Sequence, residues 1–272
     1  MNAFPSTHGL RWPCFAGRSV LALLDDSPQG RQAGLRAEMI ARGLGVPLDL
    51  LPAGAAPARV AAMCSGAGLL VLPYQPGHAI AECLWGTPPE RASRWLDMPT
   101  LVVARPAIAP YRRVLVPVQL DDDAAPLIDA ARQLSGEARL RVLHVLDRRV
   151  ESSLWLADAP EPAMRAQRQR RSLAARVALD RAITLARADD RTASMVSSGD
   201  VAARVLESAC GSRTQLVVMG RRRRSLLGQL LTGSIATRVI GAGHADVLLL
   251  PLHGRSRPAG ARRGEGEVPA YT

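Results

Sequence analysis

LVVMGRRRRSLLGQLLTGSIATRVIGAGHADVLLLP, residues 216–251, begins and ends with an apolar run. Neither run (Leu216–Met219 and Val247–Leu250) alternates with polar residues, which is typical of parallel strands buried on both faces. Between them we expect Gly220 to end the first strand, a basic loop to follow, and Gly233-Ser234 to begin an amphipathic helix. Glycines that let a ligand come close, followed by free N–H groups at a helix start, favour binding of an anion such as phosphate.

The rest of the chain alternates short apolar runs with segments of helical spacing. Strands are predicted at 20–24, 48–51, 69–72, 100–104, 114–118, 140–146 and 193–196, and helices at 29–44, 58–65, 87–96, 124–134, 162–188 and 200–210. Gly45 lies just past the first helix, as expected of a C-terminal cap. This alternation predicts a doubly wound, parallel α/β fold.

The spacing of the quoted stretch occurs a second time, 147 residues earlier. Pro73, Pro76 and Gly86-Thr87 stand in the same frame as Gly220, Arg223 and Gly233-Ser234. An internal repeat of this kind predicts two similar domains rather than one large sheet. We expect domains at 18–105 and 111–252, joined by a linker over 105–110, with flexible termini at 1–17 and 253–272.

This pattern resembles the C-terminal signature of the universal stress protein family, whose nucleotide-binding members carry G-x2-G-x9-G-S/T between the last two strands. Arg223 stands at the middle glycine of that signature. The segments RRVLVPV (112–118), LHVLD (143–147) and GDVAARVLESA (199–209) are also similar to the family. The resemblance implies a bacterial chain of two Rossmann-like, adenine nucleotide alpha hydrolase-like domains in tandem, of which the first is shortened and degenerate.

The resemblance also implies a site for ATP, with Mg²⁺ accompanying the nucleotide, in the second domain. The N–H groups at 233–235 and the Ser234 hydroxyl would hold phosphates, and Val145 would line the adenine pocket. Gln119 stands where ATP-binding members have an aspartate that contacts the ribose. The implied nucleotide-binding residues are Val118, Gln119, Val145, Met219, Gly220, Arg223, Gly233, Ser234 and Ile235.

Two alternatives remain open at this site. Arg223 either obstructs the phosphate space or pairs with phosphate through its guanidinium, and the loop either binds a nucleotide or is kept only as part of the fold. In the first domain, Pro73 and Pro76 cannot donate N–H groups to phosphate, so we expect no ligand there. Asp25 is then expected to serve a turn or a helix cap at the end of its strand.

The net charge of +11 would ordinarily indicate an acidic partner. The chain contains no lysine, however, so its arginine excess also fits a compositional bias. The Arg221–Arg224 run either contacts a polyanion such as RNA, DNA or polyphosphate or forms a solvated loop. It has no aromatic residues interleaved with it, so a stacking platform for single-stranded nucleic acid is absent. The arginines of the 162–188 helix are expected to face water, with a membrane surface or an acidic partner as the alternative.

Other function classes have little support in the sequence. The four cysteines are far apart, which argues against a metal or disulfide framework and favours a reducing cytoplasm. No apolar run approaches the ~20 residues needed to span a membrane. His144 has no second ligand at metal spacing, and no nucleophile elbow is present. We therefore expect at most weak ATP hydrolysis.

The expected partners follow from the repeat. The resemblance implies that two such domains pair across their last strands, here Thr100–Ala104 and Val247–Leu250 within one chain. That pairing would cover hydrogen-bonding groups that are otherwise left open. Further dimerisation, and a protein partner contacted through the basic surface, stay open.

Overall fold

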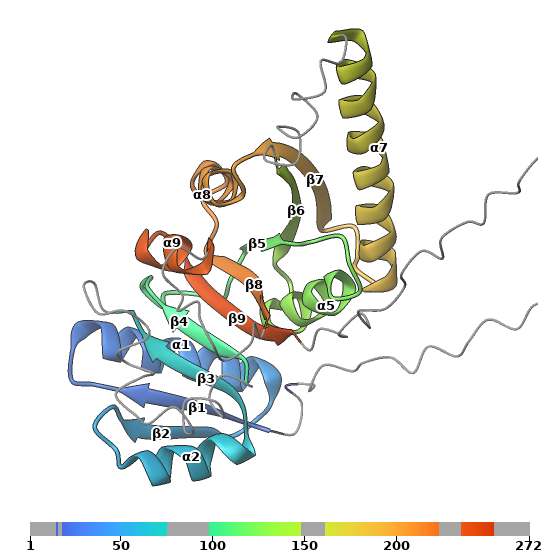
Figure 1. Cartoon of the computed structure of the whole chain (residues 1–272). Coiled ribbons are helices and arrows are strands. Elements are labelled where there is room, and N and C mark those ends of the chain that lie inside the picture. The colour runs from blue at the N-terminus through green and yellow to red at the C-terminus, as the bar shows by residue number, and fades with distance from the viewer. Residues whose placement is uncertain (1–14, 16–17, 75–97, 148–160, 223–234, 253–272) are drawn as a thin grey trace, which may run out of the picture.

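The computed structural model describes residues 15, 18–74, 98–147, 161–222 and 235–252 (Figure 1). The first half of the chain contributes β1 (Ser19–Leu24), α1 (Pro28–Leu44), β2 (Leu48–Pro52), α2 (Pro57–Gly66), β3 (Ala67–Pro73) and β4 (Thr100–Val103). The second half contributes β5 (Arg113–Pro117), α5 (Ala124–Ser135), β6 (Arg139–Asp147), α7 (Glu161–Leu185), β7 (Thr192–Gly199), α8 (Val201–Gly211), β8 (Leu216–Arg222), α9 (Ile235–Gly241) and β9 (Asp246–Leu252). The predicted order of elements is confirmed over these residues.

The strands form one sheet in the order β2-β1-β3-β4-β9-β8-β5-β6-β7. Within each half all pairings are parallel, as the unbroken apolar runs predicted. Because β4 and β9 pair with each other, the hydrogen bonding of the first half continues into the second, while the division into domains at 18–105 and 111–252 stays a prediction. The strands of both halves therefore belong to a single nine-stranded sheet.

The β4–β9 pairing is antiparallel and confirms the expected contact between the last strands of the two halves. Leu101 lies opposite Leu248, flanked by Thr100 opposite Leu249 and by Val102 opposite Val247. Leu101 and Leu248 are 147 residues apart, which is the offset of the repeated frame. A local two-fold axis therefore relates the halves at this pair, and the carboxyl ends of their strands point to opposite edges of the sheet.

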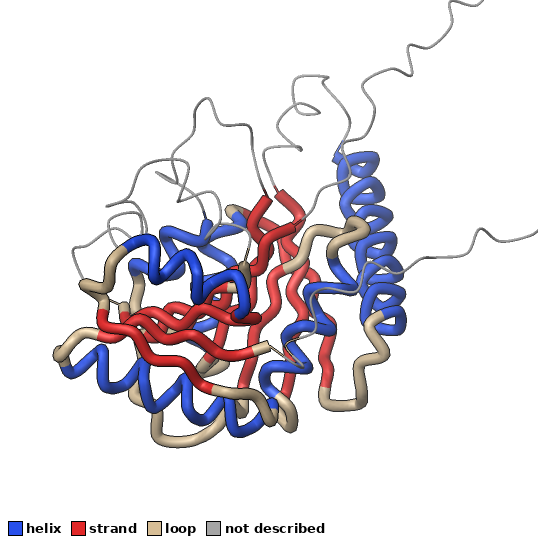
Figure 2. Tube along the Cα trace, turned by 90° about the horizontal axis from the view of Figure 1, so that it is seen from below, coloured by secondary structure: helices blue, strands red, loops and turns tan. Residues whose placement is uncertain are grey.

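Helices cover both faces of the sheet (Figures 1 and 2). On one face, α1, α5 and α7 pack over a single apolar cluster that runs through both halves and includes Ala37, Leu101, Ile128, Leu179 and Leu248. On the other face α2 covers one cluster, and α8 and α9 cover another. The continuous cluster means that neither half completes its core without the other.

The start of α1 shows how the sequence sets the chain direction after a strand. The Ser27 hydroxyl caps α1 by accepting a hydrogen bond from the Gly30 N–H at 2.9 Å. The Asp25 carboxylate accepts hydrogen bonds from the Ser27 N–H and the Ser27 hydroxyl. Asp25 thus forms the expected turn at the strand end, while the cap itself is Ser27. Gly45 ends the helix in the left-handed conformation, with φ of 66°.

Candidate functional site

The second half has a change of winding direction at β5. This strand pairs with β6 on one side and with β8 on the other, so the loops that follow β5 and β8 diverge at the carboxyl edge. In open α/β sheets, ligands bind in the crevice at such a switch point. The segments 117–121, 144–147 and 219–222 end at this edge. The edge is therefore the candidate site.

Val118 and Gln119 follow β5 directly. The Val118 N–H donates to the Leu143 carbonyl at 2.9 Å, and its side chain is 7% exposed. The Gln119 carbonyl accepts from the Asp121 N–H at 3.0 Å, which turns the chain, while the residue itself is exposed. The amide of Gln119 is thus at the surface of the candidate edge, where the resemblance implies a ribose contact.

His144 fixes the end of β5 from the neighbouring strand. Its Nδ1 lies 3.0 Å from the Val118 carbonyl oxygen. Because a carbonyl can only accept, Nδ1 carries the proton in this contact. The histidine is half-buried, so its role is to hold Val118 in place. The sequence alone showed only a lone histidine within an apolar strand.

Three of the predicted residues come together on one face of the sheet. Val145 and Met219 are 9% and 7% exposed and belong to the cluster beneath α8 and α9, against which Ile235 also packs. The Val118 side chain belongs to the cluster on the opposite face. The structure thus brings Val145, Met219 and Ile235 into one apolar wall and leaves Val118 to contribute through its backbone.

Gly220 does not end its strand, contrary to the sequence prediction. β8 continues through Gly220 to Arg222, with Gly220 opposite Leu250 and Arg222 opposite Leu252. A Cβ added at Gly220 would lie 2.3 Å from Leu252 Cδ1 and 2.8 Å from its Cγ. A side chain at position 220 would therefore require the Leu252 side chain to move, and this long-range contact gives no local signal in the sequence. Arg223, Gly233 and Ser234 lie outside the described residues.

Charged residues surround the candidate edge. Asp121 and Asp123 follow β5, and the Asp123 N–H donates to the Asp121 carboxylate at 3.1 Å. Asp200 caps α8 through the Ala203 N–H and pairs with Arg238 of α9 at 3.2 Å, which ties the two helices together. Among the residues that the structure describes, no group of three His, Cys, Asp or Glu could hold a metal ion. The carboxylates after β5 were not singled out from sequence, although their position after an apolar run is a signal for this edge.

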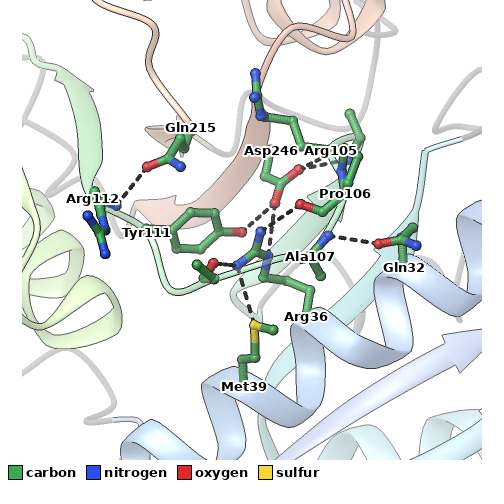
Figure 3. A network of polar contacts seen from close by, with 12 residues as sticks. Gln32, Arg36, Met39, Arg105, Pro106, Ala107, Tyr111, Arg112, Gln215 and Asp246 are labelled. Carbon is green, nitrogen blue, oxygen red and sulfur yellow. Dashed lines mark hydrogen bonds and ion pairs between the residues drawn. The ribbon is translucent and has the colours of Figure 1, made fainter.

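A second polar cluster lies at the junction of the halves, around the buried Asp246 (Figure 3). One carboxylate oxygen accepts hydrogen bonds from the N–H groups of Ala104 and Arg105, at 2.9 and 2.8 Å. The other accepts from the Tyr111 hydroxyl at 2.6 Å and lies 3.3 Å from Arg36 Nε. The carboxylate therefore contacts both α1 and the segment 104–111, which joins β4 to β5.

Arg36 reaches the same cluster from α1 and is 4% exposed. It donates to the carbonyls of Ala109 and Pro106, at 2.8 and 3.4 Å, and its guanidinium lies 4.2 Å from the Tyr111 ring centroid (Figure 3). Arg36 Nε forms an ion pair with the Asp246 carboxylate at 3.3 Å, but the contact does not have hydrogen-bond geometry. Nε is therefore left without a hydrogen-bond acceptor. The segment 105–110, which the sequence indicated as a plain linker, is thus fastened to both halves.

Both carboxylate oxygens of Asp246 are occupied by members of the junction cluster, and there is little room beside it. A cavity of about 190 Å³ lies nearby, lined by Gln29, Gln32 and Val103–Pro106 among others. Ligand pockets for molecules of nucleotide size typically enclose about 300 Å³ or more. Burial raises the pKa of Asp246, although Tyr111, the two N–H groups and Arg36 favour its charged form. We conclude that this cluster holds the halves together.

The Tyr111 phenol gives a test of this geometry by pH. Burial, the Asp246 charge and the hydrogen bond to Asp246 raise the pKa of Tyr111 well above its ordinary value of 10.0, against a lowering by Arg36. The stability that this shift contributes is complete below pH 10 and is lost as the pH rises further. We expect the free energy of unfolding to fall by about 1.4 kcal/mol more per pH unit above 10 than it does in Tyr111→Phe.

Urea unfolding at pH 8 to 11 measures this difference, with absorbance at 295 nm reporting phenol ionisation. Tyr74→Phe is the matched control, because the Tyr74 hydroxyl donates to the Gly241 carbonyl at an exposed position. A Tyr111→Phe variant with the same alkaline slope as the natural chain would contradict a phenol buried against Asp246.

Comparison with known proteins agrees with this architecture. Residues 110–251 match the model of the universal stress protein family. A functionally unknown protein from Pseudomonas aeruginosa PAO1 is 18% identical, with a TM-score of 0.56 over 86% of this chain and 92% of that one. A universal stress protein from Archaeoglobus fulgidus DSM 4304 is 14% identical, with a TM-score of 0.56 over 87% of this chain and 97% of that one. No functionally curated protein matches the sequence significantly.

The sheet order and the switch point define a doubly wound α/β protein of Rossmann-like type, whose two halves are joined in one sheet. Because the family model covers more than half of the 272 residues, the chain belongs to the universal stress protein family. The solved structures extend the likeness in fold to the first half of the chain. No helix of the described residues is long and apolar enough to cross a membrane.

Proposed function

We propose that the protein is a nucleotide-responsive regulatory module of the stress response, which binds ATP at the carboxyl edge of its second half. The observation that carries the proposal is the switch point at β5, where Gln119 follows β5 and where Val145 and Gly220 lie near the carboxyl ends of the neighbouring strands β6 and β8. Occupancy of the site would alter contacts with a protein partner. We place the protein in the cytoplasm, where its cysteines stay reduced.

Each element of the candidate edge has a role in this proposal. The wall formed by Val145, Met219 and Ile235 offers apolar surface beside the adenine position. The Gln119 amide, exposed at the end of β5, offers hydrogen bonds to ribose hydroxyls. The phosphates would be held by the backbone at 233–235 and by Arg223, with Mg²⁺ accompanying the nucleotide. No residue of the described edge forms a pair of nucleophile and base, so rapid hydrolysis is not part of the proposal.

Calorimetric titration with ATP and Mg²⁺ tests the proposal, after any nucleotide carried through purification has been assayed. We expect micromolar affinity, about −8 kcal/mol, and its loss in Gly233→Ala. Gln119→Asp should bind ATP about 3- to 10-fold more tightly, because a carboxylate accepts stronger hydrogen bonds from ribose hydroxyls. Gln29→Asp is the matched control: it makes the same change at an exposed position that follows β1, at the opposite edge of the sheet.

Two further outcomes discriminate the alternatives. Arg223→Gly should weaken binding if the guanidinium pairs with phosphate and strengthen it if the side chain obstructs the loop. A flat titration, with no nucleotide carried through purification, would overturn the proposal. The basic surface of the chain, with its net charge of +11, would then favour a protein that acts through contacts with an acidic partner and without a nucleotide.

A further inference from the structure

Helix α7 has an outward face that no described element covers. The helix is 25 residues long, and its buried residues are Met164, Ala175, Leu179 and Ala182. It stands at the margin of the molecule and extends past the neighbouring strands in both views (Figures 1 and 2). Leu173 and Val177, on the other side of the helix, are 64% and 63% exposed. Two large apolar side chains one turn apart on a free helix face indicate a contact surface.

The exposed face continues as a stripe with a spacing of four and three residues. We call it the outer stripe, and its members are Ala166, Arg170, Leu173, Val177, Asp180 and Thr184, all of them exposed. This spacing is the heptad pattern with which two helices pack side by side. Leu173 and Val177 lie in the middle of the stripe, and Arg170 and Asp180 border them, one at each end. The other charged residues of the helix do not show this arrangement.

The order of residues in the outer stripe is self-complementary when it is read backwards about residue 175. Leu173 exchanges with Val177, Arg170 with Asp180, and Ala166 with Thr184. In an isologous dimer, the same patch on both copies must complement itself under a two-fold rotation. An antiparallel pair of such helices would place apolar on apolar, small on small, and opposite charges together.

We propose that a second copy of this chain is the partner of the outer stripe, through antiparallel pairing of the two α7 helices. Leu173 packs on Val177 of the second copy, and Arg170 pairs with Asp180 of the second copy, on both sides of the axis. This contact is separate from the β4–β9 pairing, which is already used within the chain. The contact adds a second copy to a molecule whose two halves are already joined.

The self-complementary order of the stripe, rather than the net charge of α7, favours a second copy over other occupants. Asp180 lies within the stripe, so an anionic lipid surface or an acidic helix would meet a carboxylate beside the apolar pair. A second copy supplies Arg170 at that position. Arg176 and Arg181 are exposed beside the stripe, and each would lie near an arginine of the second copy (Arg176 and Arg170, respectively), which weakens the pairing. The stripe spans ~27 Å and buries roughly 300 Å² on each copy, well below a standard interface. We therefore expect a dissociation constant of roughly 10–100 µM.

Sedimentation velocity of the full chain from 5 to 500 µM tests the proposal, in low salt and with a reducing agent because Cys210 is exposed. The natural chain should pass from monomer to dimer over this range. Arg170→Asp and Asp180→Arg should each weaken the dimer about 10-fold or more, because like charges then face each other. The double variant exchanges the charges and should restore the affinity to within about 3-fold of the natural chain.

Leu185→Ser is the matched control, because Leu185 is 66% exposed on the same helix but lies off the stripe. It should leave the dimer unchanged, whereas Leu173→Glu should abolish it. Circular dichroism checks that every variant keeps its helices. A chain that is monomeric at 500 µM, a double variant no better than the single ones, or an equal loss in Leu185→Ser would each overturn the proposal. Binding of the monomer to phosphatidylserine vesicles through Leu173 would overturn it in favour of a lipid partner.

Discussion

Replacing Asp246 with asparagine is expected to lower the free energy of unfolding by about 3–5 kcal/mol. Asparagine has nearly the same shape, so the change removes the charge while it leaves the packing in place. Arg36 would remain 4% exposed with no anion to balance it, and its Nε already has no hydrogen-bond acceptor. The penalty therefore comes from the buried cation that is left behind. Urea unfolding followed by circular dichroism measures it.

A double-mutant cycle identifies the source of this loss. The variant Arg36→Met/Asp246→Asn should be more stable than Asp246→Asn alone, because the unbalanced cation is removed as well. Glu38→Gln on the same helix is the matched control: its pair with Arg42 is exposed, and its loss should change stability by less than about 1 kcal/mol. A loss in Asp246→Asn no larger than in Glu38→Gln would show that the junction does not depend on this carboxylate.

Leu101→Ala is expected to lower the free energy of unfolding by about 3–5 kcal/mol. Leu101 is fully buried, faces Leu248 across the β4–β9 junction, and belongs to the cluster shared by both halves. Removing its branched end leaves a cavity in tightly packed surroundings. Because the cluster is continuous, both halves should lose stability together and the chain should still unfold in one transition.

Urea unfolding, monitored by intrinsic fluorescence and by circular dichroism, tests both parts of this prediction. Leu50→Ala on the edge strand β2 is the matched control, since Leu50 is 57% exposed and its truncation should cost less than about 1 kcal/mol. Two separate transitions in Leu101→Ala, with the second half unchanged, would mean that the halves are independent units and would contradict the shared core.

Local patterns were enough to predict most elements of the fold. The strand at 114–118, the helix at 124–134 and the strand at 140–146 were within one residue or so of β5, α5 and β6, because apolar runs and glycine or aspartate boundaries are short-range signals. The pairing of the last strands followed from the internal repeat and the family resemblance. These features depend on residues close together in sequence, or on a pattern repeated along it.

Features that depend on distant contacts were not predictable. Gly220 was interpreted as a strand breaker because glycine often has that role, whereas it lies within β8 and its Cα is covered by Leu252 of the adjacent strand. Asp246 gave no signal, because its partners Arg36 and Tyr111 lie 210 and 135 residues away in the chain. In the candidate site, Val145 and Met219 were placed together by the family pattern. The backbone role of Val118 required the structure.

The junction between the halves is symmetric in backbone and asymmetric in side chains. Counting 147 residues back from Asp246 leads to Pro99, so the carboxylate that fastens the linker has no counterpart across the local axis. In a dimer of identical subunits, every substitution appears twice, and a buried charge introduced on one side is also introduced on the other. Within a single chain, one side of the interface is free to change alone. Joining the two halves in one polypeptide thus allows the two sides of the junction to carry different residues.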